Sequence, residues 1–200
     1  MTQPISRSQS PVGPVLKSSQ RIGVGSQETP QAPQVKADFL SLQHETPAAS
    51  SWIDAATQQI PHADAAALSR LADEAMAKAH LPGSTPTQQA SCYFVASQAY
   101  GRLSNDLKVD ENSNGEKAFH AIVKAVQLDP SRPDIVQGYG EAIKALVDLN
   151  GFERAFAEDF LGVDTLQEAK HAVKLLDKLP PDAKAASTQK ALSAFIQSQE

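Results

Sequence analysis

Residues 115–130 read GEKAFHAIVKAVQLDP, and this stretch decides the fold. Its apolar residues recur at the spacing of one helix face, which predicts an amphipathic helix. They are Ala118, Phe119, Ile122, Ala125, Val126 and Leu128. Pro130 ends the helix, because proline has no amide hydrogen and disfavours helical geometry in the residue before it. A second helical pattern, SRPDIVQGYGEAIKAL, begins near Pro133, and two helices joined by a short break predict a helical hairpin.

The spacing within this stretch resembles the second helix of a tetratricopeptide repeat. That helix carries a small residue, a large apolar residue four positions later, an alanine three later and a proline five after that. Here the four positions are Ala118, Ile122, Ala125 and Pro130. Gly140 matches the close-contact glycine of the family, and the resemblance is strongest over residues 115–146. It implies antiparallel helix pairs that pack closely through small residues and stack side by side.

Residues 1–49 differ in composition from the rest of the chain. Six of the 13 prolines lie here, serine and glutamine are frequent, and the first aromatic residue is Phe39. Such a segment buries too little apolar surface to offset the entropy of ordering it. We therefore predict a disordered tail over 1–49 and a helical domain over 50–200. Within the tail, VKADFLSLQ (35–43) is either an apolar island that docks on a partner or on the protein's own groove, or an incidental short helix.

Helical periodicity and capping residues predict further helices on both sides of the central hairpin. The predicted helices lie near 50–60, 64–81, 87–103, 115–129, 133–149, 150–162, 164–178 and 183–197. A polar loop, SNDLKVDENSNG, is predicted to end at Gly115. The expected fold class is all-α: antiparallel helical hairpins stacked as an irregular tetratricopeptide-like array. Beyond residue 146 the repeat register is open, because 164–178 is the first helix of a pair by counting and the second by its alanine and proline spacing.

Composition excludes several classes of protein. The net charge of -5 argues against a general nucleic-acid binder, which needs a basic surface to neutralise phosphates. The single cysteine, Cys92, excludes an internal disulfide framework and a multi-cysteine zinc site, and we interpret it as a buried apolar residue. No apolar run is long enough for a transmembrane helix, so we expect no membrane insertion.

No pattern in the sequence predicts catalysis. The stretch DENSNG, 110–115, matches the start of a calcium loop, but the twelfth position is Ala121 instead of a glutamate. We interpret it as an exposed turn in which Asn112 or Asn114 caps the following helix. The five histidines lack the spacing of metal ligands. We therefore expect no enzymatic activity, no metal site and no cofactor.

The family resemblance implies a partner-binding groove on the concave face of the helical stack. The groove residues that it implies are Tyr93, Ser97, Tyr100, Asp134, Gln137, Glu141 and Lys144. Such a mixed polar and aromatic surface suits an extended peptide, and we expect Tyr100 and Glu141 to lie outside the core. The predicted function is a non-enzymatic protein–protein interaction module, an adaptor or chaperone that binds a peptide or partner protein.

The N-terminal composition favours an alternative function. Arg7, Lys17 and Arg21 precede the first acidic residue, Glu28, within a serine-rich and proline-rich segment. This composition resembles the unstructured export segment of bacterial type III secretion substrates. The alternative is therefore a secreted effector or a type III secretion-associated protein. Because no apolar signal core is present, we expect either a cytoplasmic protein or secretion by a route that needs no signal peptide.

Overall fold

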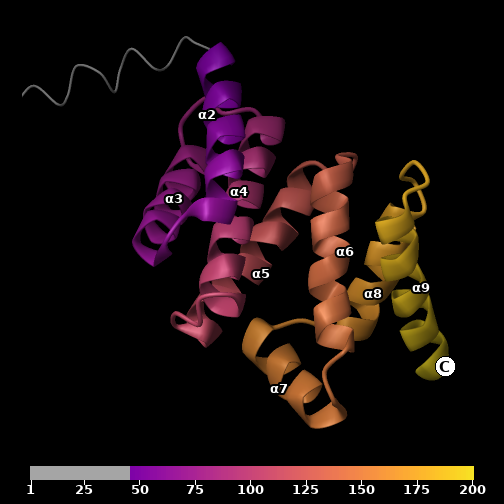
Figure 1. The fold of residues 1–200 in the computed structure, drawn as a ribbon. Coiled ribbons are helices and arrows are strands. Elements are labelled where there is room, and N and C mark those ends of the chain that lie inside the picture. Colours follow the sequence, from indigo (N-terminus) through magenta and orange to yellow (C-terminus); the bar gives the residue numbers. More distant parts are fainter. Residues whose placement is uncertain (1–45) are drawn as a thin grey trace, which may run out of the picture.

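The computed structural model describes the backbone of residues 46–200 and the side chains from Ser51 onward. This part of the chain forms eight α-helices and one short 3-10 helix, without a strand, so the all-α prediction is confirmed. The elements are α2 (Thr46–Gln59), η2 (Ile60–His62), α3 (Ala65–Ala79), α4 (Pro86–Asn105), α5 (Glu111–Leu128), α6 (Pro133–Val147), α7 (Gly151–Leu161), α8 (Thr165–Leu176) and α9 (Ala183–Ser198). Figure 1 shows their arrangement.

Polar side chains fix the starts of several helices. Asp64 accepts a hydrogen bond from the Ala67 amide at 2.8 Å and so caps α3 at the start of the helix predicted near 64–81. Thr85 with Gln88, and Asn150 with Glu153, form reciprocal capping boxes at α4 and α7. Each cap satisfies amide groups that the first helical turn leaves without a partner.

Helix α2 begins at Thr46, before the predicted domain boundary at residue 50, so residues 46–49 are helical and do not belong to a tail. The sequence interpretation counted Pro47 as a residue of the tail. Proline is nevertheless tolerated in the first turn of a helix, where its missing amide hydrogen has no intrahelical acceptor to lose. The predicted disorder of residues 1–45 and the apolar island at 35–43 lie outside the described residues.

The helices fall into two packed groups that meet where α5 contacts α6. Helix α4 lies at the centre of the first group, between α3 and α5, and also contacts α2. In the second group α6 packs against both α8 and α9, which form a hairpin (Figure 1). Helix α5 packs more extensively on α4 than on α6. The finer tetratricopeptide-like arrangement therefore stays a prediction, and α7 lies at the edge with few contacts to α5 and α6.

The core is built from small residues and a few large ones. Ala125 is fully buried, as expected of a close helix contact, and Cys92 is buried as predicted. Burial raises the pKa of the Cys92 thiol, because an apolar environment disfavours the thiolate. Tyr139 is fully buried, and its phenol donates a hydrogen bond to Glu168 on α8. This bond satisfies a polar atom that would otherwise be costly to bury.

The start of α5 differs from the prediction. The helix begins at Glu111, so the calcium-like stretch lies in its first turns and Gly115 is helical instead of forming a turn. Asn114 Nδ2 donates a hydrogen bond to the carbonyl oxygen of Val109 at 2.6 Å, and Asp110 precedes the helix with a φ of 42°. The prediction that Asn112 or Asn114 caps this helix is therefore wrong, because both residues already belong to it.

Candidate functional site

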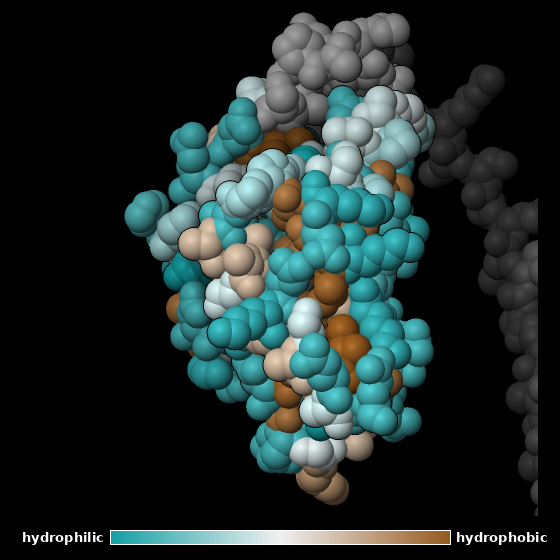
Figure 2. Space-filling view, turned by 90° about the vertical axis from the view of Figure 1, so that its right-hand side faces the viewer, coloured by the Kyte–Doolittle hydropathy of each residue, from teal (hydrophilic) through white to brown (hydrophobic). Residues whose placement is uncertain are grey.

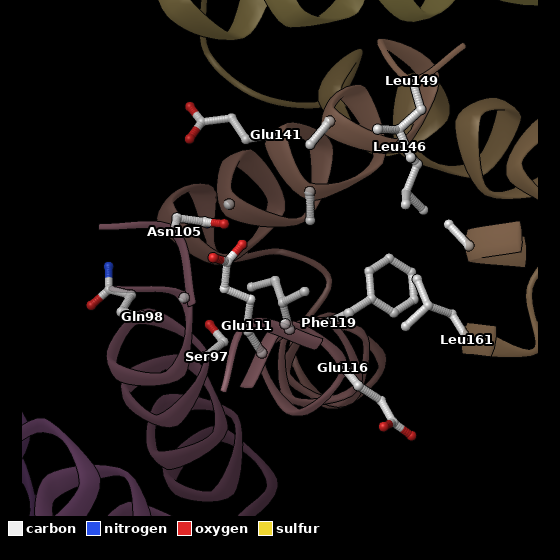
Figure 3. A pocket seen from close by; sticks show the side chains of 18 of the residues that line it. Ser97, Gln98, Asn105, Glu111, Glu116, Phe119, Glu141, Leu146, Leu149 and Leu161 are labelled. Atoms are coloured by element: carbon white, nitrogen blue, oxygen red, sulfur yellow. The ribbon is translucent and has the colours of Figure 1, made fainter. Parts of the chain in front are cut away.

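A groove with a volume of about 760 Å³ lies between α4, α5, α6 and α7. Side chains from elements far apart in the sequence line it, so it forms only when the two helical groups have packed together. Figure 3 shows that its lining is divided. Ser97, Gln98, Asn105, Glu111 and Glu141 form a polar end, and Phe119, Leu146, Leu149 and Leu161 form an apolar end, with Glu116 beside Phe119.

Helix α7 supplies aromatic side chains to the apolar end. Phe156 and Phe160 line the groove, and their rings stack with centroids 6.2 Å apart and planes 7° from parallel. Phe152, Phe156 and Phe160 are 85%, 64% and 44% exposed, and α7 has no fully buried residue. We call these three residues the phenylalanine stripe. An amphipathic helix normally buries its apolar side, so this face lacks its complement among the described residues.

The ends of α7 are nevertheless held in place. The Arg154 guanidinium lies 4.8 Å from the ring centroid of Phe195 on α9, and its Nη1 donates to the Val147 carbonyl oxygen at 3.3 Å. Glu158 accepts a hydrogen bond from the Thr165 amide at 3.2 Å. Ala157 is partly buried against the core. The stripe is thus presented by a positioned helix and is not a loose segment.

Acidic side chains surround the groove. The lining carboxylates are Glu111, Glu116, Asp134, Glu141 and Glu153, and among the described lining residues Lys184 is the one lysine or arginine. Lys184 Nζ lies 2.5 Å from Glu141 Oε1. The net charge of this lining is therefore negative, which favours a ligand that carries positive charge.

The ionised form of Asp134 is favoured by a neighbouring arginine. Its carboxylate forms a bidentate pair with Arg132, in which the Nε and Nη2 atoms each donate at 2.8 Å. Partial burial acts to raise the pKa of Asp134, but the hydrogen bonds and positive charge of Arg132 outweigh burial and lower it. Asp134 is consequently negative at neutral pH.

The Gln98 side-chain amide has an unsatisfied polar atom in the lining. Its Oε1 atom is buried and has no hydrogen-bond partner among the described residues. A buried acceptor without a donor costs about 1–3 kcal/mol. A ligand that places an N–H group in the polar end of the groove would remove this cost, so Gln98 is a candidate for reading a peptide backbone or a polar side chain.

The structure brings together four of the seven residues that the family resemblance implies. Ser97, Asp134, Gln137 and Glu141 all line the groove. These four residues come from α4 and α6, two of the helices that form the groove.

The remaining three residues lie elsewhere. Tyr93 and Tyr100 face α3: the Tyr93 hydroxyl lies 3.2 Å from His80 Nε2, and the Tyr100 hydroxyl donates to Asp73 Oδ1 at 3.2 Å. Lys144 forms an ion pair with Asp148 and does not line the groove. Tyr100 is only 8% exposed, so the expectation that it lies outside the core is wrong. The physical reason is that α3 covers the side of α4 on which these tyrosines lie.

Sequence reasoning missed the phenylalanine stripe as a candidate site. The signal was present, because Phe152, Phe156 and Phe160 recur every four residues within GFERAFAEDFL. Side chains four apart lie on one side of a helix, but the sequence does not show whether a neighbouring helix covers that side. The apolar residues of the groove from α5, α6 and α7 escaped notice for the same reason.

The other features of the described surface suggest no second site. On the face that Figure 2 presents, apolar residues form a narrow, interrupted line among hydrophilic ones. Among residues 46–200 no group of three or more histidine, cysteine, aspartate or glutamate side chains is arranged to hold a metal ion. None of the described helices is both long and apolar enough to cross a bilayer.

Comparison with known proteins found no match to this chain among protein-family models, curated proteins or solved structures.

Proposed function

We propose that the protein is a non-enzymatic protein–protein interaction module, an adaptor or a chaperone, that binds a segment of a partner in the groove between α4, α5, α6 and α7. The observation that carries this proposal is the phenylalanine stripe. Two of its three side chains line the groove, and all three are exposed on a helix that buries no residue fully. Large exposed apolar side chains beside polar ones are typical of binding surfaces.

The energetics of the apolar end favour a partner with large apolar side chains. Covering an exposed phenylalanine contributes about 1.5–3 kcal/mol. Phe156 and Phe160 lie at the apolar end with Leu161, so one apolar side chain of a partner can contact several of these residues at once. Contacts of this kind, made in a desolvated pocket, carry most of the binding free energy at protein interfaces.

The polar end of the groove would fix the orientation of a bound segment. Gln98 offers an unpaired acceptor, and Glu111 and Glu141 add negative charge beside it. A bound segment would therefore direct N–H groups or basic side chains toward this end and apolar side chains toward α7. Charge complementarity of this type affects specificity and association rate more than affinity.

The proposal is tested with an array of short synthetic peptides that vary independently in apolar and basic content. We expect the full chain to bind peptides that combine a large apolar residue with a lysine or arginine. The double variant Phe156→Ser/Phe160→Ser should lose this binding, because both side chains line the groove. Phe152→Ser is the matched control: it makes the same chemical change on the same helix, at a position outside the groove lining.

Two outcomes contradict the proposal. One is equal peptide binding by the parent chain and the Phe156→Ser/Phe160→Ser variant at equal thermal stability. The other is loss of binding in Phe152→Ser to the same extent as in the double variant, because that would place the binding surface on the outer side of α7.

A further inference from the structure

The acidic, half-apolar groove has a chemical complement within the same chain. Residues 15–24 read VLKSSQRIGV and combine Lys17 and Arg21 with apolar residues at both ends. No acidic residue occurs before Glu28. We propose that this segment occupies the groove when no partner is bound, which makes the N-terminus an internal competitor for the site. The inference rests on the proposed function of the groove as a binding site for apolar and basic segments.

The length of the connecting chain permits this contact. The 21 residues from 25 to 45 join the segment to α2, and they span about 70 Å when extended. The 14 residues of α2 are about 21 Å long. Its C-terminal turn lies beside the groove, since Thr57 lines a small neighbouring cleft together with Gln98, Gly101 and Asn105, which also line the groove. The connecting residues therefore exceed the distance along α2 by a wide margin.

The same argument disfavours the apolar island at 35–43, most of whose residues have a shorter reach than residues 15–24. Helix α2 begins at the opposite side of the molecule from α7 (Figure 1). The chain from residue 43 to Thr46 covers only about 10 Å, which is less than the length of α2. From Phe39 the chain to Thr46 spans about 24 Å, which is little more than the length of α2. The length of the connecting chain thus favours residues 15–24 over the more apolar island at 35–43 as the occupant of the groove.

Charge complementarity also favours residues 15–24 as the occupant of the groove. The five carboxylates of the groove outnumber its one lysine, and Lys17 and Arg21 bring positive charge without any acidic neighbour. Several of the carboxylates already pair with basic side chains at the groove edge, as Glu111 does with Lys108 at 3.5 Å. Such exposed pairs contribute little, so Lys17 or Arg21 can replace the existing partner at small cost.

Tethering makes a weak contact sufficient. A segment joined to its own site by a short chain meets it at an effective concentration on the order of millimolar. With a dissociation constant for the free segment of about 0.1 mM, the groove would be occupied about ten times more often than empty, and an external peptide would bind about tenfold more weakly. Occupation by the segment therefore raises the concentration of partner that is needed to fill the groove.

The first test places a nitroxide on the full-length chain through Ser19→Cys. Cys92 is buried and its thiol is disfavoured as thiolate, so the label attaches at position 19. We expect the label to broaden amide signals of Gln98, Gln137 and Ala145, which line the groove. The matched control is the labelled chain with Lys17→Glu and Arg21→Glu, in which the broadening should disappear.

The second test measures affinity. A synthetic peptide of residues 13–26 should bind the Lys17→Glu/Arg21→Glu chain about tenfold more tightly than the parent chain, since the altered tail no longer competes. The Phe156→Ser/Phe160→Ser chain should bind it weakly whichever tail it carries. Equal affinity for the parent and the charge-reversed chain overturns the inference.

The outcomes separate this inference from the proposed function. Absence of broadening from the Ser19 label, together with specific binding of array peptides at the groove, overturns the inference and leaves the function standing. Absence of both overturns both. Broadening seen only when spin-labelled chains are mixed with separate isotope-labelled chains assigns the groove to the segment of a second copy, and so also overturns the intramolecular contact.

Discussion

Gly140 on α6 and Leu176 on α8 approach so closely that a Cβ atom on Gly140 would lie 3.1 Å from Leu176 Cδ1. The same Cβ would lie 3.3 Å from Thr188 Cγ2 on α9. Leu176 and Thr188 are both buried, so neither has open space to move into. Three helices therefore meet at a position where the absence of a side chain sets their separation. The sequence analysis placed the close-contact glycine of the resembled family at this residue.

Replacing this glycine should weaken the second helical group. Gly140→Ala gains about 1 kcal/mol of helix propensity, but overpacking against two buried side chains costs about 1–3 kcal/mol. We expect a net loss of stability, measured as a lower denaturant midpoint. Gly101→Ala is the control, because Gly101 lies within α4 and its Cβ would meet no atom within 4 Å. That variant should gain up to about 1 kcal/mol. Equal midpoints for both variants would show that α6 and α8 separate freely.

Tyr100 should behave as a core residue. Tyr100→Ala should cost roughly 3 kcal/mol, near the lower end for removal of a large aromatic side chain from a core. Tyr100→Phe removes only the hydrogen bond to Asp73 and should cost about 0.5–1 kcal/mol, because the exposed Asp73 carboxylate can turn to water. Chemical denaturation of both variants measures these costs. A loss of unfolding free energy below about 0.5 kcal/mol for Tyr100→Ala would show that this side chain lies at the surface and not in the core.

Tyr139 makes stability sensitive to alkali. Burial, followed by the hydrogen bond to Glu168 and its negative charge, raises the pKa of Tyr139 above its usual range. Folding therefore favours the neutral phenol, and this stabilising contribution is complete below the unfolded pKa of about 10 and lost as the pH rises above it. Between about pH 8 and pH 11 the parent chain should lose more stability than Tyr139→Phe, which has no phenolic proton to lose. Parallel losses in the two proteins would contradict this account.

The phenylalanine stripe should contribute little to folding. Phe152→Ser and Phe156→Ser should each change the free energy of unfolding by no more than about 0.5 kcal/mol, because both side chains are exposed. The matching core substitution is Phe119→Ser, at a position that is 6% exposed on α5, and it should cost several kcal/mol. A large loss in Phe156→Ser would mean that α7 supports the fold as well as the groove.

Local signals in the sequence were sufficient for most helices. Asp64 and Asp164 cap the helices predicted near 64–81 and 164–178, and Pro130 follows the end of α5. The start of α5 was not predictable in the same way, because DENSNG has the composition of a turn. Side-chain contacts decide it: Ser104 Oγ donates to the Glu111 carbonyl oxygen at 2.8 Å. The periodicity of apolar residues in the sequence does not reveal such contacts between segments.

The groove was predictable only in part, for a related reason. The family resemblance implied Asp134, Gln137, Glu141 and Lys144 on α6, and the first three of these line the groove. Sequence periodicity identifies residues that share one side of a helix. It does not identify the neighbour that covers each side. Tyr100 was expected in the groove and is covered by α3, whereas Phe156 was given no role and lies exposed in the groove wall. Both errors arise from long-range packing and not from local preference.

Because α7 has no fully buried residue, its exposed side chains can affect partner binding without affecting folding. Substitutions at its exposed positions cost little folding free energy, so this face of the helix is free to change its sequence while the seven other helices hold the scaffold. Partner preference can therefore shift by successive replacements in one short element without passing through an unstable intermediate. The same property makes α7 a suitable place to exchange sequence when the groove is to be redirected to a chosen peptide.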